Sequence, residues 1–139
     1  MVSVLIFSES RYPIHRAKIK TTISEYLRNA GVEDVEISVA IVGSRKIRQM
    51  NKKWRGFDEP TAVLTFALDE PRDEKGILRI GDIVISYSEA RVIAQEDNLT
   101  MDEAVDKFLI HGLNNLFGKN DNANHFLSQI SAAKFFRTG

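Results

Sequence analysis

Strand-like and helix-like segments alternate through the first part of the sequence, and this order restricts the folds open to the chain. Residues 2–7, VSVLIF, are β-branched and apolar, which predicts a first strand. A helix is expected after Pro13, because apolar residues recur at three- and four-residue steps until Gly31. Residues 35–41 then alternate apolar side chains with mostly polar or small ones, which is typical of a half-buried strand.

The rest of the sequence predicts two more strands and a concentration of helices toward the C-terminus. The strands are TAVLTFAL (61–68) and RIGDIVISY (79–87), joined by a charged, exposed loop over residues 69–76. The expected helices cover residues 44–54 with Ser44 as cap, 89–97 opened by Ser86 or Ser88, about 100–117 with a Thr100–Glu103 capping box, and about 122–136. We therefore expect an α+β fold in which a single mixed four-stranded sheet is flanked by about five helices.

Composition narrows the function classes. The chain has 139 residues and shows no linker or repeat, so we expect one domain over residues 1–139. Lys and Arg total 19, as do Asp and Glu, so any nucleic-acid binding must come from a local basic surface. The absence of cysteine excludes thiolate metal ligands and thiol nucleophiles.

The N-terminal apolar run is too short for a membrane span and unlike a signal peptide, so we expect a cytoplasmic protein without membrane contact. The oligomeric state stays open.

The segment FLIHGLNNLFGKND, residues 108–121, carries the most chemical information. His111 and Asn115 lie one helical turn apart, so their side chains can converge on one point. Gly118 lets the chain reverse, and Asp121 could then turn back toward that point, which is a geometry for holding a metal ion or a phosphate. Spacing alone also allows a structural His111, a solvated Asn115, and an Asp121 that caps the following helix.

This segment resembles the signature of the YbeY family of rRNA-maturation endoribonucleases, His-Gly-x-Leu-His-Leu-x-Gly-Tyr-Asp-His. The matching residues, in order and spacing, are His111, Gly112, Leu116 and Gly118. Residues 50–66, MNKKWRGFDEPTAVLTF, resemble the family's Asn…Arg-Gly-x-x-x-Pro-Thr-Asp-Val-Leu-Ser-Phe block, and residues 80–86, IGDIVIS, resemble its Gly-Asp-Ile-x-Ile-Ser strand. Three such blocks in the family's order imply the zincin-like YbeY fold.

The resemblance also shows where the chain departs from the family. Three histidines of the signature bind zinc in the family, and here His111 retains the first position while Asn115 and Asp121 occupy the other two. Further departures include Ala62 for Asp, Thr65 for Ser, Lys119 for Tyr and Asn120 for Asp.

The altered ligand set changes the expected metal. A carboxylate oxygen is an acceptable zinc ligand, whereas a neutral amide oxygen is a poor one. The set implied by the resemblance, His111, Asp121 and Asn115, thus leaves three alternatives: weakly held zinc, another divalent ion such as magnesium or manganese, or no metal. His125 could replace a missing ligand if the last helix packs back, and is otherwise an ordinary histidine.

Arg55 matches the arginine of the second block, which in the family is thought to face the active cleft. Its guanidinium can hold a phosphate through two parallel hydrogen bonds. Further cations precede it on the same predicted helix and could form a stripe that binds the RNA backbone, or could simply be a solvated face: Lys52, Lys53 and Arg48, with Arg45 and Lys46. Trp54 could stack on a base, although a packing role is the better interpretation.

The resemblance implies a metal-dependent endoribonuclease that hydrolyses ribosomal RNA, with the small ribosomal subunit as a partner. Arg55 and His111 would be its catalytic residues. The alternative is a catalytically impaired relative that binds RNA or a ribosomal partner without tight metal binding. Loss of two ligand histidines favours the alternative, whereas retention of His111, Gly112, Gly118 and Arg55 favours the enzyme.

Overall fold

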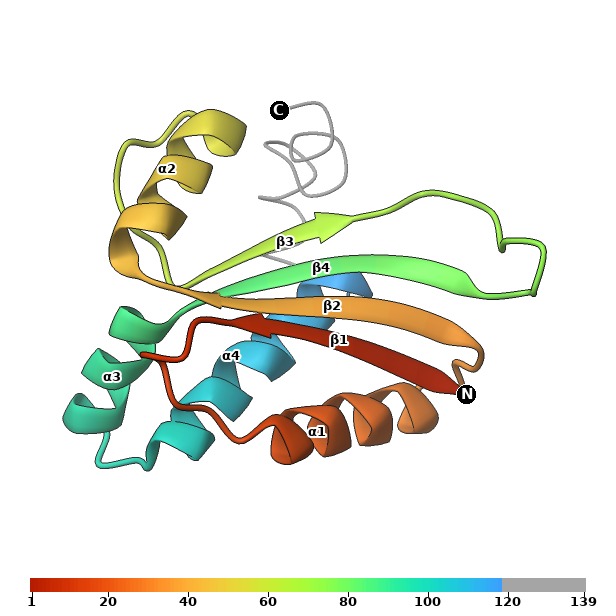
Figure 1. Ribbon diagram of the computed structural model, residues 1–139, viewed down its shortest axis with the longest axis horizontal. Helices are drawn as coiled ribbons and strands as arrows, with labels where there is room; N and C mark the ends of the chain where they lie inside the picture. The colour runs from red at the N-terminus through yellow and green to blue at the C-terminus, as the bar shows by residue number, and fades with distance from the viewer. Residues whose placement is uncertain (119–139) are drawn as a thin grey trace.

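The computed structural model describes residues 1–118, which form a four-stranded sheet and four helices (Figure 1). The elements follow the order predicted from the sequence. In chain order they are β1 (Val2–Ser8), α1 (Arg16–Asn29), β2 (Val35–Val42), α2 (Ser44–Arg55), β3 (Val63–Ala67), β4 (Leu78–Ser86), α3 (Tyr87–Glu96) and α4 (Met101–Leu116). The helix expected over about 122–136 lies outside the described residues.

The sheet is mixed, and its strands lie in the order β1-β2-β4-β3. β1 and β4 both pair with β2 in parallel, while β3 pairs with β4 as an antiparallel hairpin. The exposed loop between β3 and β4 is held in place, because Arg72 donates hydrogen bonds to the carbonyl oxygens of Asp34 and Gly76 at 2.9 Å each. The predicted α+β fold with a single mixed sheet is confirmed.

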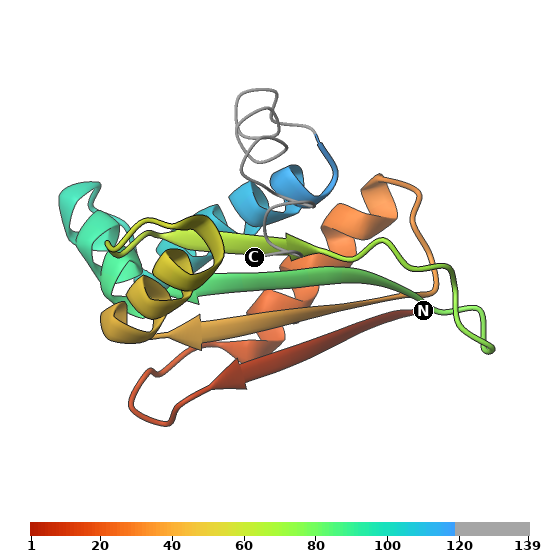
Figure 2. The same ribbon diagram turned by 90° about the horizontal axis from the view of Figure 1, so that it is seen from above.

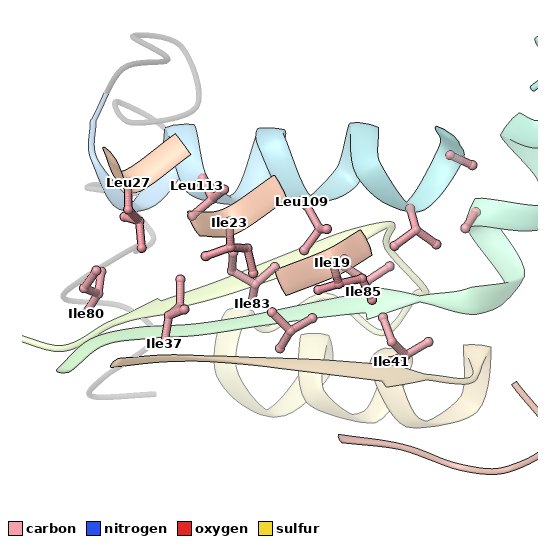
Figure 3. Close-up of a cluster of buried hydrophobic side chains, with 14 of the residues drawn as sticks. Ile19, Ile23, Leu27, Ile37, Ile41, Ile80, Ile83, Ile85, Leu109 and Leu113 are labelled. Atoms are coloured by element: carbon pink, nitrogen blue, oxygen red, sulfur yellow. The ribbon is translucent and has the colours of Figure 1, made fainter. Parts of the chain in front are cut away.

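Helices cover both faces of the sheet (Figures 1 and 2). Figure 3 shows the main core, in which isoleucines of β2 and β4 lie beneath α1 and α4. Its fully buried members include Ile23 and Leu27 of α1, Ile37, Ile83 and Ile85 of the sheet, and Leu109 and Leu113 of α4. The smaller cluster on the opposite face joins Ile47 of α2 to Leu64 and Val84. The two helices that carry the predicted site, α2 and α4, therefore pack on opposite faces.

Two of the predicted helix caps, at α3 and α4, are present in the structure, and the one predicted for α2 is not. Thr100 and Glu103 form the expected capping box at α4, since each side chain accepts a hydrogen bond from the other residue's backbone N–H. Ser86 caps α3 by accepting from the N–H of Glu89 at 3.2 Å. The prediction of Ser44 as a cap is wrong. Gly43, in an extended conformation, is the residue before α2, and Ser44 is already helical, so its hydroxyl does not cap the first turn.

α4 lies close to the sheet because Gly112 faces Ile83. A Cβ atom at Gly112 would be 2.8 Å from Ile83 Cγ2, closer than packed carbon atoms normally approach. Just beyond the helix, Gly118 has the left-handed conformation predicted for it, with φ of 66°. Both glycines of the signature thus have a conformational or packing role in positioning the end of α4.

Candidate functional site

His111 and Asn115 occupy successive turns at the C-terminal end of α4, as predicted. The helix is oriented by its buried residues Leu109, Gly112 and Leu113, which face the core. His111 lies outside that stripe and is exposed, while Asn115 is half-buried. An exposed imidazole can bind an ion without displacing core side chains.

The side-chain oxygen of Asn115 is the unusual atom of this region. Oδ1 is shielded from solvent and accepts no hydrogen bond from the described residues. The neighbouring Asn114 differs, because its Oδ1 accepts a hydrogen bond of 2.6 Å from the Tyr26 hydroxyl. A buried carbonyl oxygen without a donor is costly, and a metal ion or a ligand N–H would satisfy it. Asn115 therefore has the properties of a ligand oxygen, whereas Asn114 has a structural partner.

The other two candidate metal ligands, Asp121 and His125, lie outside the described residues. Within residues 1–118, no group of three or more His, Cys, Asp or Glu side chains could hold a metal ion. The described part of α4 thus contributes two of the three predicted ligands, one nitrogen and one oxygen.

Arg55 ends α2, and the chain turns sharply after it. Gly56 has a left-handed φ of 81°, and its N–H bonds to the carbonyl of Lys52 at 3.0 Å. The Arg55 guanidinium is half-buried and lies 5.4 Å from the centre of the Phe57 ring. Burial lowers the pKa of Arg55, and the charge of Glu59 opposes that effect. An arginine stays protonated at neutral pH, so a partly desolvated cation lies at this turn.

Asn51 holds the loop that follows Arg55. Its side chain is 2% exposed, and Nδ2 donates a hydrogen bond of 2.8 Å to the carbonyl of Glu59. The carbonyl of Asn51 also accepts from the N–H of Phe57 at 3.4 Å. These bonds fold residues 56–59 back against α2. Asn51 was not predicted as a functional residue, although it lies in the second sequence block.

The remaining predicted RNA-binding residues, Arg48, Lys52 and Lys53, are exposed on α2. Arg48 Nε donates a hydrogen bond of 2.8 Å to Asp58, and Lys52 Nζ lies 3.9 Å from the same carboxylate. Lys53 Nζ instead lies over the Trp54 ring, 4.9 Å from its centre. Trp54 is half-buried and packs edge-on against Phe66, which supports the packing role over an exposed stacking surface.

The two helices that carry the predicted site, α2 and α4, both pack against β3. Leu64 and Phe66 of this strand pack with α2, while α4 contacts β3 from the other side of the sheet. Thr65, which takes the place of the family's serine, is 2% exposed and pairs with Ile83, the residue beneath Gly112. Substrate bound by both Arg55 and His111 would therefore have to lie across β3.

Gly81 is a further residue whose role could not be read from the sequence. Its φ is 153°, and an added Cβ would lie 2.3 Å from the carbonyl oxygen of Phe66. It also lies beside an irregularity in the pairing of β2 with β4. The adjacent Asp82 accepts a hydrogen bond from the Ser38 hydroxyl on the neighbouring strand, so this acid has a structural partner. Close contact of β3 with β4 requires glycine at this position.

Comparison with known proteins identifies the family. The family model described as endoribonuclease YbeY matches residues 6–132, which is most of the chain. The chain belongs to the YbeY family. A YbeY relative from Anaeromyxobacter sp. strain Fw109-5 is 40% identical over 101 residues, and one from Sulfurihydrogenibium sp. strain YO3AOP1 is 38% identical over 106 residues. Both are named endoribonuclease YbeY.

The matches differ in how much of each YbeY relative they cover. The alignment with the Anaeromyxobacter protein covers 73% of this chain and 52% of the relative, and that with the Sulfurihydrogenibium protein covers 76% and 69%. A YbeY from Treponema denticola is 32% identical over 126 residues, covering 88% of this chain and 81% of the relative. The chain thus spans between about half and four fifths of these YbeY relatives.

The YbeY fold assignment has structural support. The solution structure of a Thermotoga maritima protein matches with a TM-score of 0.54 and 21% identity, covering 88% of this chain and 86% of that protein. Identity at this level supports the fold alone. Among residues 1–118, no helix has the length and apolar character needed to cross a membrane.

Proposed function

We propose that this YbeY-family chain is a metal-dependent endoribonuclease that hydrolyses ribosomal RNA during its maturation. The observation that carries the proposal is an exposed imidazole, His111, one turn before Asn115, whose buried Oδ1 accepts no hydrogen bond from residues 1–118. The family assignment supports the same reaction, because the curated relatives are named endoribonucleases.

The donors on α4 fit a divalent cation. His111 provides a nitrogen, Asn115 provides a neutral oxygen, and we assign the third position to Asp121 by its match to the family signature. With only one nitrogen in the set, ions that favour oxygen ligands, Mg²⁺ and Mn²⁺, are preferred over Zn²⁺. An ion bound there would supply a water of lowered pKa and polarise a phosphoryl oxygen.

The protein's own residues would bind and orient the RNA. Arg55 is the catalytic arginine in this proposal, since its half-buried guanidinium keeps its charge where competing water is reduced. It would donate hydrogen bonds to the phosphate that is cleaved. The exposed cations Arg48, Lys52 and Lys53 of α2 would contact neighbouring phosphates. His111 would serve both as a ligand and as a polar group next to the reacting phosphate.

The proposed setting of the reaction follows from the family. The substrate is ribosomal RNA, presented with the small ribosomal subunit, and the reaction takes place in the cytoplasm. The zero net charge means that binding depends on the basic side of α2 and not on the whole surface.

A cleavage assay tests this proposal. Purified protein with all 139 residues is incubated with a labelled ribosomal RNA fragment in Mg²⁺, Mn²⁺ or Zn²⁺, or in EDTA. We expect cleavage that depends on added metal and is faster with Mg²⁺ or Mn²⁺ than with Zn²⁺. Binding of the same RNA without cleavage under every metal condition would contradict the proposal and favour the catalytically impaired alternative.

A further inference from the structure

The cations of α2 fall on two flanks of the helix, and all of them except the half-buried Arg55 are exposed. Arg48, Lys52 and Arg55 follow one another at four- and three-residue steps, so they share one flank. Lys46 and Lys53 lie seven residues apart on the other flank. The first flank leads directly to Arg55, the proposed catalytic arginine, and is the one that faces the loop over residues 56–59.

Asp58 is the carboxylate that pairs with Arg48 and Lys52 on the first flank. Asp58 accepts a hydrogen bond of 2.8 Å from Arg48 Nε through Oδ1, while its Oδ2 lies 3.9 Å from Lys52 Nζ. The hydrogen bond from Arg48 lowers the pKa of Asp58, so this carboxylate remains ionised at neutral pH. The Asn51–Glu59 hydrogen bond fixes the loop one residue further along, which keeps Asp58 over the helix.

The other flank differs in this respect. Within residues 1–118, no carboxylate lies within ion-pair distance of Lys46 or Lys53. Among the described residues, Arg48 and Lys52 therefore already hold an anion, whereas Lys46 and Lys53 are open to an incoming one.

We propose that Arg48 and Lys52 form a phosphate-binding site that Asp58 fills in the free protein and an RNA backbone phosphate takes over on binding. The site rests on the proposed function, because its ligand is the RNA of that reaction. A carboxylate and a phosphate both present oxygen acceptors to the same Arg–Lys pair, so one can replace the other without rebuilding α2. Asp58 then limits the affinity for RNA and keeps other anions away from the flank beside Arg55.

Exchange at this site is physically easy. The side chains of Arg48, Lys52 and Asp58 are 55%, 67% and 53% exposed, so water screens their attraction. Exposed ion pairs of this kind contribute little to stability. A polyanion that also binds Lys53 and Arg55 brings its next phosphate close to Asp58, which raises the local concentration of the competing anion.

The Asp58→Asn variant tests the proposal, because it removes the negative charge of residue 58 and keeps the shape of the side chain. Binding of a labelled single-stranded RNA of mixed sequence is measured in EDTA across a salt series. We expect the affinity at low salt to rise about threefold to tenfold. The slope of log affinity against log salt should stay close to that of wild type, because the bound RNA makes the same phosphate contact with Arg48 and Lys52 in both proteins.

Asp97→Asn is the matched control. Asp97 lies 3.6 Å from Lys107, far along the chain from α2, so its replacement causes the same change in net charge and also frees a lysine. A rise in affinity shared equally by both variants would be a net-charge effect and would overturn the site. Thermal midpoints of both variants are expected to stay within about 2 °C of wild type, because only exposed pairs are lost.

A double variant tests whether the gain in RNA affinity depends on Arg48. Adding Arg48→Ala to Asp58→Asn should return the RNA affinity to the wild-type value or below it, while Arg48→Ala alone should weaken binding less than it does in the Asp58→Asn background. An unchanged affinity in Asp58→Asn, with wild-type protein that still cleaves RNA, would refute this site and leave the proposed function intact. Wild-type protein that neither binds nor cleaves RNA would refute the proposed function itself.

Discussion

His111→Ala is expected to reduce metal-dependent RNA cleavage by at least about a hundredfold, because even outer residues of metal sites typically cost up to that factor. His111 provides the nitrogen ligand in the proposed site and lies beside Asn115 on α4. Its side chain is exposed and outside the buried stripe of the helix, so the variant should fold and melt like wild type. Initial cleavage rates of the ribosomal RNA fragment, measured in Mn²⁺, provide the test.

His15→Ala is the control for this variant. His15 is also exposed, and it pairs with Asp102 at 3.3 Å near the start of α4, away from the end that carries Asn115. We expect its cleavage rate to stay within about twofold of wild type, as is usual for surface changes away from a site. Equal losses in the two variants, or full activity in His111→Ala, would remove His111 from the active site.

Gly81→Ala should destabilise this fold strongly, because the substitution adds both a steric clash and backbone strain. The new Cβ would lie 2.3 Å from a backbone carbonyl oxygen of β3 and 3.2 Å from Leu116 Cδ2, and φ of 153° disfavours any side chain. Neither the paired strand nor α4 can move without breaking hydrogen bonds or core contacts. We expect a loss of about 3 kcal/mol in unfolding free energy, seen as a fall in Tm of about 10 °C.

Gly76→Ala separates backbone strain from the steric clash. Gly76 also has a positive φ, 79°, and belongs to the same β3–β4 hairpin, but an added Cβ would meet nothing within 4 Å. Its replacement should cost about 1 kcal/mol, the usual penalty for a left-handed residue with a side chain. If both variants lost the same stability, the close contact between β3 and β4 at Gly81 would not be a determinant of this fold.

Much of the fold could be predicted because local patterns decide where its elements begin and end. The apolar alternation of residues 35–41 became β2, and the Thr100–Glu103 pair capped α4 as expected. The strand order β1-β2-β4-β3 was not predictable from such patterns, because it depends on contacts between residues far apart in the chain. Ser44 is not the cap because the helix begins one residue earlier than the pattern suggested. Gly43 is the last extended residue before α2, and Ser44 is the first helical one.

The candidate site could be predicted only in part. Helical spacing placed His111 beside Asn115, and the family blocks singled out Arg55. Spacing does not reveal that Asn115 Oδ1 finds no hydrogen-bond donor in the described part of the chain while the adjacent Asn114 does, because that difference depends on Tyr26 of α1. The partnership of Asp58 with Arg48 likewise results from a loop that Asn51 folds back on α2. Both features arise from tertiary contacts, so no local pattern carries them.

The central claim is that the end of α4 binds a divalent cation through His111 and Asn115, and paramagnetic broadening by Mn²⁺ tests it most directly. Mn²⁺ is added in small amounts to ¹⁵N-labelled protein, and the loss of each amide signal is followed by NMR. We predict that the Asn115 side-chain amide and the backbone amides of the last turn of α4 broaden first, and that His111→Ala abolishes this pattern. Broadening centred on His15 and Asp102, broadening centred on the acidic loop over residues 69–76, or no selective broadening would contradict the claim.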